Sequence, residues 1–239
     1  MLEAFGTNIW IVNGPTVVAA AGFHYPTRMA IIRLNNGDLV LWSPTALNDP
    51  LRAEIEALGP VRALIAPNSL HHTFLGDWQS AYPDAKVYAA PGLPKKRKDI
   101  RFDHTFDDVP ISAWRGEIEH AILWGNHITT EVILFHRQSG TAIFTDLIQQ
   151  FPRGWFHGWR ALVARLDLMT APSPTVPRKF RLAFTDRARA KECLGPVLAW
   201  PTRKVIIAHG EPITENGQTF LKRAFGWLGH IPQEGRRHE

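Results

Sequence analysis

The sequence predicts an α/β protein in which two sets of β-strands form a two-layered core that helices cover on both faces. Three observations support this fold class. Short apolar segments alternate with helical segments along the 239 residues. Hydrophobic residues make up 45% of the chain and charged residues 21%, which is typical of globular proteins. The chain also shows no internal repeat and no linker, so we expect a single domain over residues 1–239.

The first half of the chain is predicted to contribute five strands and two helices. The strands are expected at residues 8–13, 28–34, 38–43, 61–67 and 85–91. The helices are expected at residues 49–58 and 75–82. Asn36-Gly37 lies between the second and third strands and is a typical hairpin turn. Asn48 or Asp49 can cap the first helix.

The second half is predicted to contribute a further set of strands and two longer helices. The strands are expected at residues 119–125, 131–137, 141–146 and 203–209, and the helices at residues 186–199 and 214–228. Thr185 or Asp186 can cap the first of these helices and Thr214 the second. Residues 147–185 are rich in Trp, Pro and Arg, and we expect them to be irregular.

Composition limits the compartment and the partners. The single cysteine, Cys193, cannot form an internal disulfide, and the first ten residues do not resemble a signal peptide, so we expect a cytoplasmic protein. No apolar run approaches the ~20 residues of a membrane helix, so we expect no membrane partner. The net charge is +5, and Lys95–Lys98 form a basic cluster that we interpret as a solvated loop. We therefore expect no nucleic-acid partner, although this cluster leaves nucleic-acid processing as a weaker interpretation.

The residues that carry chemistry lie where apolar strands end. His71 and His72 follow the strand at 61–67, His127 follows 119–125, Asp146 ends 141–146, and His209 ends 203–209. Ligands and catalytic groups concentrate at the carboxyl ends of strands, because a rigid scaffold holds the loops there. Imidazole and carboxylate groups together suit Zn²⁺ or another first-row divalent metal. The joint placement of these groups predicts a metal site, whereas each group alone is weak evidence.

Other mechanisms lack their sequence signals. The chain contains no G-x-S-x-G nucleophile elbow and neither of the common glycine-rich nucleotide motifs. Cys193 lies in the middle of a predicted helix, where packing explains it better than nucleophilic catalysis.

Several of these segments resemble the metallo-β-lactamase fold superfamily, over most of the chain. "DLVLWSP" resembles its strand that normally ends in Asp-Thr-Gly, and "LIAPNSLHHTFLG" stands where its H-x-H-x-D-H motif is expected. "TAIFTD" is similar to the strand that ends in the metal-bridging Asp, and "VIIAHGEP" to the last strand with its His-Gly. More narrowly, "GPVRALIAPNSLHH" and "YPDAKVYAAPGLPKK" are similar to an uncharacterised domain family within that superfamily. The resemblance implies a four-layer αββα sandwich with its site at one edge between the sheets.

The departures from the superfamily motif predict a degenerate site. If His72 aligns with the last His of the motif, its first two His positions fall on Pro67 and Ser69, and a shift of one residue puts Asn68 at the first of them. In neither alignment are two His present there. The resemblance then leaves His127 as the remaining ligand of the first metal site. His72, Asp146 and His209 would hold the second site, with His71 in place of a carboxylate. We therefore expect at most one tightly bound metal, tentatively zinc, or none.

Two functions remain open at this point. The first is a metal-dependent hydrolase of an unknown small-molecule substrate, in which His71 is a further ligand or the proton acceptor. The second is a non-catalytic binding protein with the same fold and a structural metal or no metal. Neither the substrate nor the oligomeric state follows from the sequence.

Overall fold

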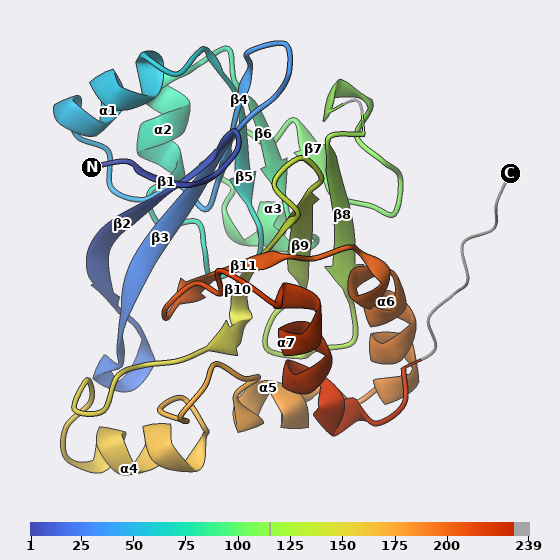
Figure 1. The fold of residues 1–239 in the computed structure, drawn as a ribbon. Helices are drawn as coiled ribbons and strands as arrows, with labels where there is room; N and C mark the ends of the chain where they lie inside the picture. The colour runs from blue at the N-terminus through green and yellow to red at the C-terminus, as the bar shows by residue number, and fades with distance from the viewer. Residues whose placement is uncertain (115, 232–239) are drawn as a thin grey trace, which may run out of the picture.

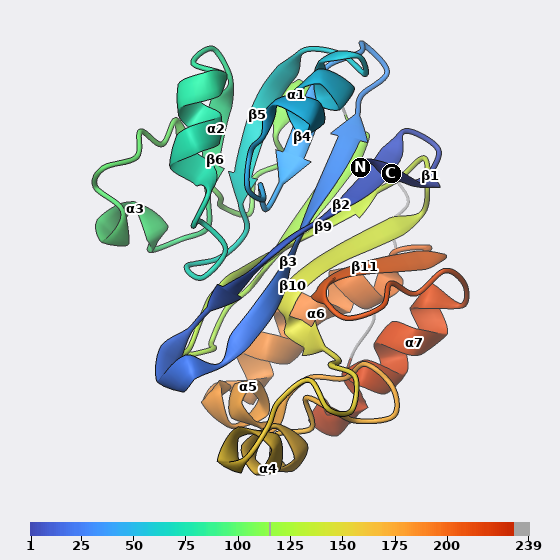
Figure 2. The ribbon, with the colours of Figure 1, turned by 90° about the vertical axis from the view of Figure 1, so that its left-hand side faces the viewer.

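Two β-sheets pack face to face in the computed structural model, which describes residues 1–114 and 116–231 (Figure 1). Figure 2 shows helices on the outer face of each sheet, so that the order of layers is helix, sheet, sheet, helix. The predicted four-layer αββα sandwich is confirmed.

The seven-stranded sheet has the strand order β1-β2-β3-β4-β5-β6-β7, and the four-stranded sheet the order β11-β10-β9-β8. The first sheet consists of β1 (Glu3–Gly6), β2 (Ile9–Val18), β3 (His24–Arg33), β4 (Leu39–Trp42), β5 (Val61–Ala66), β6 (Lys86–Ala89) and β7 (His104–Thr105). The second consists of β8 (Ile118–Leu123), β9 (Glu131–His136), β10 (Thr141–Gln149) and β11 (Lys204–His209). Strands β4 to β7 run parallel to one another, and so do β10 and β11, whereas the other neighbours are antiparallel.

Helices of both halves of the chain bury the outer faces of the sheets. The first sheet is covered by α1 (Asp49–Glu56), α2 (Leu75–Ala81) and α3 (Leu93–Lys96), and the second by α5 (Arg178–Ala183), α6 (Arg187–Ala199) and α7 (Gly217–Ala224). Helix α4 (Trp159–Leu166) lies at one end of the sandwich (Figure 1). Short 3₁₀ turns occur at Ala20–Gly22, Ser112–Trp114 and Gly226–Leu228.

Strand β3 shows why the central strands have continuous apolar sequences instead of alternating apolar and polar residues. Ala30 and Ile32 point into the layer between the sheets, while Met29 and Ile31 pack against the layer of α1 and α2. Successive side chains of a strand face opposite sides, and here both sides are covered. All four residues are fully buried.

Arg28 ties the two sheets together beside the candidate site. Its guanidinium on β3 donates hydrogen bonds to the carbonyl oxygens of Ile207 and Gly210 on and after β11, and to Asn13 Oδ1 on β2. Burial lowers the pKa of Arg28, but the side chain remains a donor because guanidinium stays charged. These bonds fix the end of β11, where His209 lies.

Two helix starts agree with the sequence, and the structure decides between the capping residues. Asn48 Oδ1 accepts a hydrogen bond from the Leu51 amide at 2.9 Å, and Asp186 Oδ1 accepts one from the Arg189 amide at 2.9 Å. Each bond satisfies one of the free amides of the first helical turn.

The prediction that residues 147–185 are irregular is wrong in part. β10 continues to Gln149, and the segment contains α4 and α5. Neither helix has a side-chain cap, because α4 is preceded by Gly158 and α5 by Pro177. The usual sequence signal of a helix start is therefore missing from both.

The predicted last helix begins later and ends earlier than expected, and Thr214 does not cap it. The residue before α7 is Asn216, which is in the left-handed region with φ 55° and makes no capping bond. The Gly217 and Gln218 amides instead donate to the carbonyl oxygens of Arg203 and Thr202, each at 2.8 Å. The backbone that leads into β11 thus replaces a capping side chain.

Candidate metal centre

Three side chains near the carboxyl ends of strands converge at one edge of the sandwich. His71 follows β5, and His209 is the last residue of β11. Asp146 was expected to end its strand but is the sixth of the nine residues of β10, three residues before Gln149. Because β5 lies beside β4 in one sheet and β10 beside β11 in the other, the carboxyl ends of both parallel pairs meet here. Gly210 after β11 permits the sharp exit of the chain: its φ is 141°, and a Cβ there would lie 2.7 Å from the Gln150 carbonyl oxygen.

The three side chains are close enough to share one ion. His71 Nε2 lies 3.2 Å from Asp146 Oδ2 and 3.2 Å from His209 Nε2, and His209 Nε2 lies 3.3 Å from Asp146 Oδ1. One ligand atom from each residue can be chosen so that all three lie within 4.8 Å of one another. Two imidazole nitrogens and one carboxylate match the ligand types of zinc and other first-row divalent metals.

A hydrogen bond on the far side of each imidazole orients the ring. His209 Nδ1 lies 2.9 Å from the Pro26 carbonyl oxygen, which can only accept, so Nδ1 carries the proton. Burial lowers the pKa of His209, which favours the neutral ring and leaves Nε2 with a free lone pair toward Asp146. His71 Nδ1 lies 2.9 Å from Ser43 Oγ, a hydroxyl that can donate or accept, so this bond orients the ring without fixing which nitrogen carries the proton.

The carboxylate supplies a buried negative charge. Burial opposes ionisation of Asp146, but His71 and His209 outweigh it and hold the pKa of this carboxyl well below its usual range. Asn68 Nδ2 donates to Asp146 Oδ2 at 2.7 Å, and Gln149 Nε2 donates to Oδ1 at 3.3 Å. Because His209 Nδ1 already carries a proton toward Pro26, Nε2 can stabilise the carboxylate only with a second proton or with another cation between the two groups. A metal ion can supply that charge. The residues therefore fit a divalent metal.

A buried glutamate supports the strand that carries Asp146. Glu131 begins β9, and its carboxylate accepts hydrogen bonds from the amides of Thr145, Asp146 and Leu147 at 2.8–3.1 Å. Burial, and then the charge of Asp146, raise the pKa of Glu131 to about 7. These bonds fix the backbone of β10 at the position from which Asp146 reaches the centre.

The centre lies in the wall of a cavity of about 360 Å³. Its apolar wall includes Val17, Leu70, Phe74, Ile128 and Phe180. Cationic and hydroxyl groups also line it: Lys96, Lys179 and Tyr25. Lys179 Nζ lies 3.4 Å from Tyr25 Oη and 3.4 Å from Asp167 Oδ2. The cavity can therefore hold a molecule with an apolar body next to the three converging side chains.

His72 and His127, which the sequence also named as candidate ligands, are not part of this group. His72 lines the cavity, but its Nδ1 accepts a hydrogen bond from Arg97 Nη1 at 2.7 Å. Burial, Lys96 and Arg97 lower the pKa of His72 to about 4. His127 is exposed, and its Nε2 lies 2.7 Å from Thr185 Oγ1. Metal binding by either residue stays a prediction.

Sequence reasoning missed the residues that orient the centre. Ser43 had a signal, since it directly follows the apolar segment 38–42, at the position where the resembled strand ends in Asp-Thr-Gly. Glu131 also had one, because it is the only charged residue in the buried segment 131–135. No sequence pattern marks Pro26, Gln149 or Lys179, because only the folded chain brings them to the centre or its cavity.

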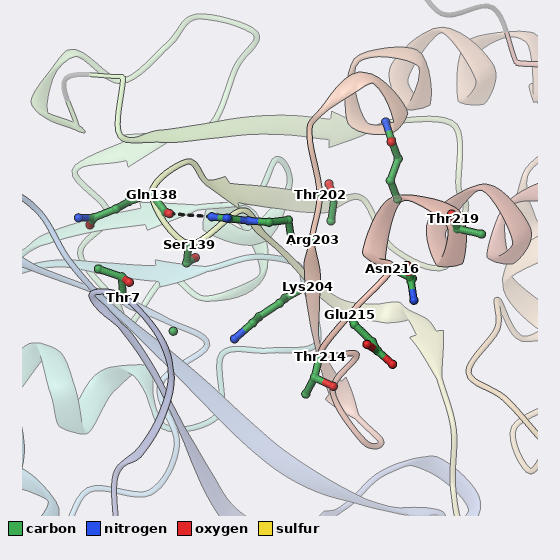
Figure 3. Close-up of a pocket in the computed structure, with 12 residues that line it drawn as sticks. Thr7, Gln138, Ser139, Thr202, Arg203, Lys204, Thr214, Glu215, Asn216 and Thr219 are labelled. Atoms are coloured by element: carbon green, nitrogen blue, oxygen red, sulfur yellow. Dashed lines mark hydrogen bonds between the residues drawn. The ribbon is translucent and has the colours of Figure 1, made fainter.

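A larger cavity of about 650 Å³ lies at the opposite end of β11 (Figure 3). Its cations are already engaged: Arg203 Nη2 donates to the Gln138 carbonyl oxygen at 3.1 Å, and Lys204 Nζ to that of Phe5 at 2.6 Å. Among its lining residues in the described part of the chain, Glu215 is the only one that offers a carboxylate, and none offers an imidazole. This cavity lacks the ligand types of the smaller one.

Solved structures define the class of fold. Metallo-β-lactamase FIM-1 from Pseudomonas aeruginosa, in its mono-zinc form, is 14% identical with a TM-score of 0.63, over 95% of this chain and 94% of that one. The metallo-β-lactamase from Hirschia baltica is 18% identical with a TM-score of 0.60, over 95% and 96%. That from Pontibacter korlensis is 14% identical with a TM-score of 0.62, over 95% and 98%. The chain therefore has the metallo-β-lactamase fold.

Within that fold, the chain belongs to the family described as a domain of unknown function, DUF4336. The family model matches residues 7–157, which is more than half of the chain and includes His71 and Asp146 but ends before His209. No curated protein matches this chain significantly. Among the described residues, no helix combines the length and apolarity needed to cross a membrane.

Proposed function

We propose that this chain is a hydrolase that uses a single divalent metal, zinc being the first candidate, held by His71, Asp146 and His209. The observation that supports this most is the convergence of two imidazole nitrogens and one carboxylate within 4.8 Å at the wall of a cavity. Three protein ligands leave a position for water or substrate, as in catalytic zinc sites. The mono-zinc form of FIM-1 gives a precedent for one metal in this fold.

A metal bound there would lower the pKa of a water molecule and polarise an ester, lactone, amide or phosphoester oxygen. His71 was expected to be either a ligand or the proton acceptor, and we favour the ligand role because its Nε2 faces both Asp146 and His209 at 3.2 Å. Ser43 and Pro26 hold the two rings with their Nε2 atoms inward. Lys179 and Tyr25 lie at the cavity wall, where they can orient an anionic or carbonyl group of a substrate.

One observation favours the alternative, a non-catalytic binding protein. Among the cavity-lining residues of the described chain, Asp146 is the only carboxylate, and His72 is engaged with Arg97. A hydrolase would therefore lack a separate carboxylate base of the kind that general base catalysis commonly uses.

Metal content and a substrate panel separate the two functions. We expect protein purified without added metal to hold at most one metal per chain, and to hydrolyse at least one ester, lactone or phosphoester in a way that Asp146→Ala abolishes. Hydrolysis of a chromogenic cephalosporin should be slow or absent. Two fully bound metals per chain would contradict the proposed site. One bound metal with no activity above that of Asp146→Ala across the panel would establish the binding protein instead.

A further inference from the structure

One end of the molecule carries an exposed apolar surface that includes none of the three converging side chains of the metal centre. It consists of helix α4 and the tip of the β2–β3 hairpin, residues 17–23, which together we call the apolar end. Both lie at the same edge of the molecule in Figure 1 and Figure 2. They are in contact, since Arg160 Nε donates to the Ala21 carbonyl oxygen at 2.7 Å and the Phe23 and Trp159 rings lie 5.8 Å apart.

Helix α4 is packed with its large apolar residues outward. Its outer stripe follows the i, i+3, i+4, i+7 spacing of a single helix face, and the side chains are 41–60% exposed: Trp159, Leu162, Val163 and Leu166. The inward residue is small: Ala164 is fully buried and packs against Phe151, Phe156 and Met169. An ordinary surface helix has the reverse arrangement, so this stripe is available to another surface.

The hairpin tip extends this apolar stripe. Val18 is 77% exposed, and Ala19, Ala20 and Ala21 are exposed as well. The same hairpin lines the cavity of the metal centre through Val17, Val18 and Ala19. Whatever covers the apolar end therefore lies beside residues that line that cavity.

The charge around the apolar end has one sign. Residues 14–37 and 151–166 contain no Asp or Glu, whereas the second segment contains Arg153, Arg160 and Arg165. At about 100° per residue, Arg160 and Arg165 lie on opposite sides of the apolar stripe of α4. The nearby carboxylate of Asp167 is paired with Lys179 at 3.4 Å. The apolar end is therefore complementary to a surface that is apolar inside and negatively charged at its edge.

We propose that the apolar end docks on an anionic phospholipid surface. The Trp and Leu side chains enter the boundary between headgroups and acyl chains, and the arginines contact the phosphates. A second copy of this chain fits less well, because it would bring the arginines of the two copies together.

This proposal changes an expectation from the sequence. The lack of an apolar run of ~20 residues predicted no membrane partner, but that argument applies only to helices that span the bilayer. A helix that lies in the interface needs an apolar face and flanking basic residues instead. The proposal does not depend on the proposed hydrolase activity.

Vesicle flotation of the full chain tests the apolar contact. We expect the protein to float with vesicles of phosphatidylcholine and phosphatidylglycerol in equal parts, and much less with phosphatidylcholine alone. Leu162→Glu should lower the partition coefficient about tenfold or more, because it places a charge in the buried stripe. Val109→Glu is the matched control, since Val109 is 65% exposed and Leu162 60%. Leu166→Glu repeats the test if Leu162→Glu fails to fold.

Two further experiments test the charge contact and ask whether a second copy of the chain covers the surface. Arg165→Gln should lower binding about fivefold, whereas Lys98→Gln in the basic cluster should have no effect. Failure of the wild-type chain to float, or equal losses in Val109→Glu or Lys98→Gln, would overturn the proposal. So would a wild-type dimer in sedimentation equilibrium that Leu162→Glu dissociates without any vesicle binding, which would assign the surface to a second copy.

Discussion

The two ends of the four-stranded sheet each bury a histidine, but the two rings have different neighbours. His209, at the carboxyl end of β11, faces Asp146 and His71 and borders a cavity. His136, at the opposite end, bonds only to Ser139 Oγ at 2.8 Å, and its Nε2 has no partner among the described residues. Burial lowers the pKa of both rings. A buried histidine with a shifted pKa is therefore not enough to indicate a site; a carboxylate and a second imidazole must converge on it.

The cavities at the two ends of the sheet differ in volume and in the side chains that line them. The cavity near Arg203 and Lys204 is larger than the one beside His209, about 650 Å³ against 360 Å³. Its two cations are satisfied by backbone carbonyls, and within residues 1–114 and 116–231 no imidazole lines it. The side chains that line a cavity therefore indicate a functional site better than its volume does.

The largest expected effect is on metal binding: replacing the histidine at one end of the sheet should remove the metal, and replacing the histidine at the other end should not. His209→Ala should reduce the bound metal from one per chain to none, because it removes one of three ligands. His136→Ala should keep the metal and lower the free energy of unfolding by about 2 kcal/mol, because it leaves a cavity in the core. Elemental analysis and urea unfolding of both variants measure these effects. Retention of metal in His209→Ala would show that the converging side chains are not its site.

The second effect is the contribution of His136 to the pH dependence of stability. The pKa of His136 is lowered to about 4 by burial, against about 6.5 in the unfolded chain. Between these two values the unfolded chain binds a proton that the folded chain does not, so the free energy of unfolding falls as the pH falls. The loss reaches up to about 3 kcal/mol at pH about 4.

His136→Phe isolates this contribution. Above pH about 6.5 both states carry a neutral ring, so the variant should differ from the wild type by a constant amount there. Below that pH the wild type should lose stability more steeply than the variant. Urea unfolding at several pH values between 4 and 7 measures the difference. Parallel curves for the two proteins would mean that His136 is not held neutral by the fold.

A smaller effect separates two asparagines with the same local role. Asn68 Oδ1 accepts from the amides of Leu70 and His71, and Asn126 Oδ1 accepts from those of Ile128 and Thr129. Only Asn68 also donates to Asp146. Asn68→Ala should therefore lower metal affinity about 10- to 100-fold, as loss of a ligand's hydrogen-bond partner does.

Asn126→Ala is the matched control for Asn68→Ala. Both substitutions should cost about 1 kcal/mol of stability, because each removes turn hydrogen bonds, but Asn126→Ala should leave metal affinity unchanged. Competition with a chromophoric chelator measures the affinity. An equal loss of affinity in both variants would mean that turn stability, and not the bond to Asp146, controls the site.

The positions of Asp146 and His209 near the ends of strands were predictable, because the apolar segment that marks a buried strand directly precedes each of them in the sequence. Asp146 and His209 each follow an apolar segment that a buried strand requires, and the parallel pairs bring these ends together. The alternation of strands and helices likewise predicted the layers. The length of α7 was not predictable, because its first amides bind the backbone of Thr202 and Arg203 rather than a side chain.

The choice among the histidines was not predictable, because distant residues decide it. His71 and His72 are neighbours, but the turn fixed by Asn68 directs His71 to Asp146, whereas Arg97 holds His72. His127 follows a strand as His209 does, yet Thr185, 58 residues further along the chain, binds its ring. Sequence patterns predict which residues reach the edge of the sheet, and tertiary contacts select those that meet.

The smallest expected effect tests whether a buried hydroxyl at the other end of the sheet contributes to stability or to metal binding. Thr202 is buried, lines the larger cavity, and its Oγ1 has no hydrogen-bond partner among the described residues. A buried hydroxyl without a partner destabilises the folded state, and Val has nearly the same shape without that group. Thr202→Val should therefore raise the free energy of unfolding by up to about 1 kcal/mol and leave metal binding unchanged, as urea unfolding and elemental analysis will show. A loss of stability instead would mean that this hydroxyl has a partner in solution, and the contrast between the two ends would weaken.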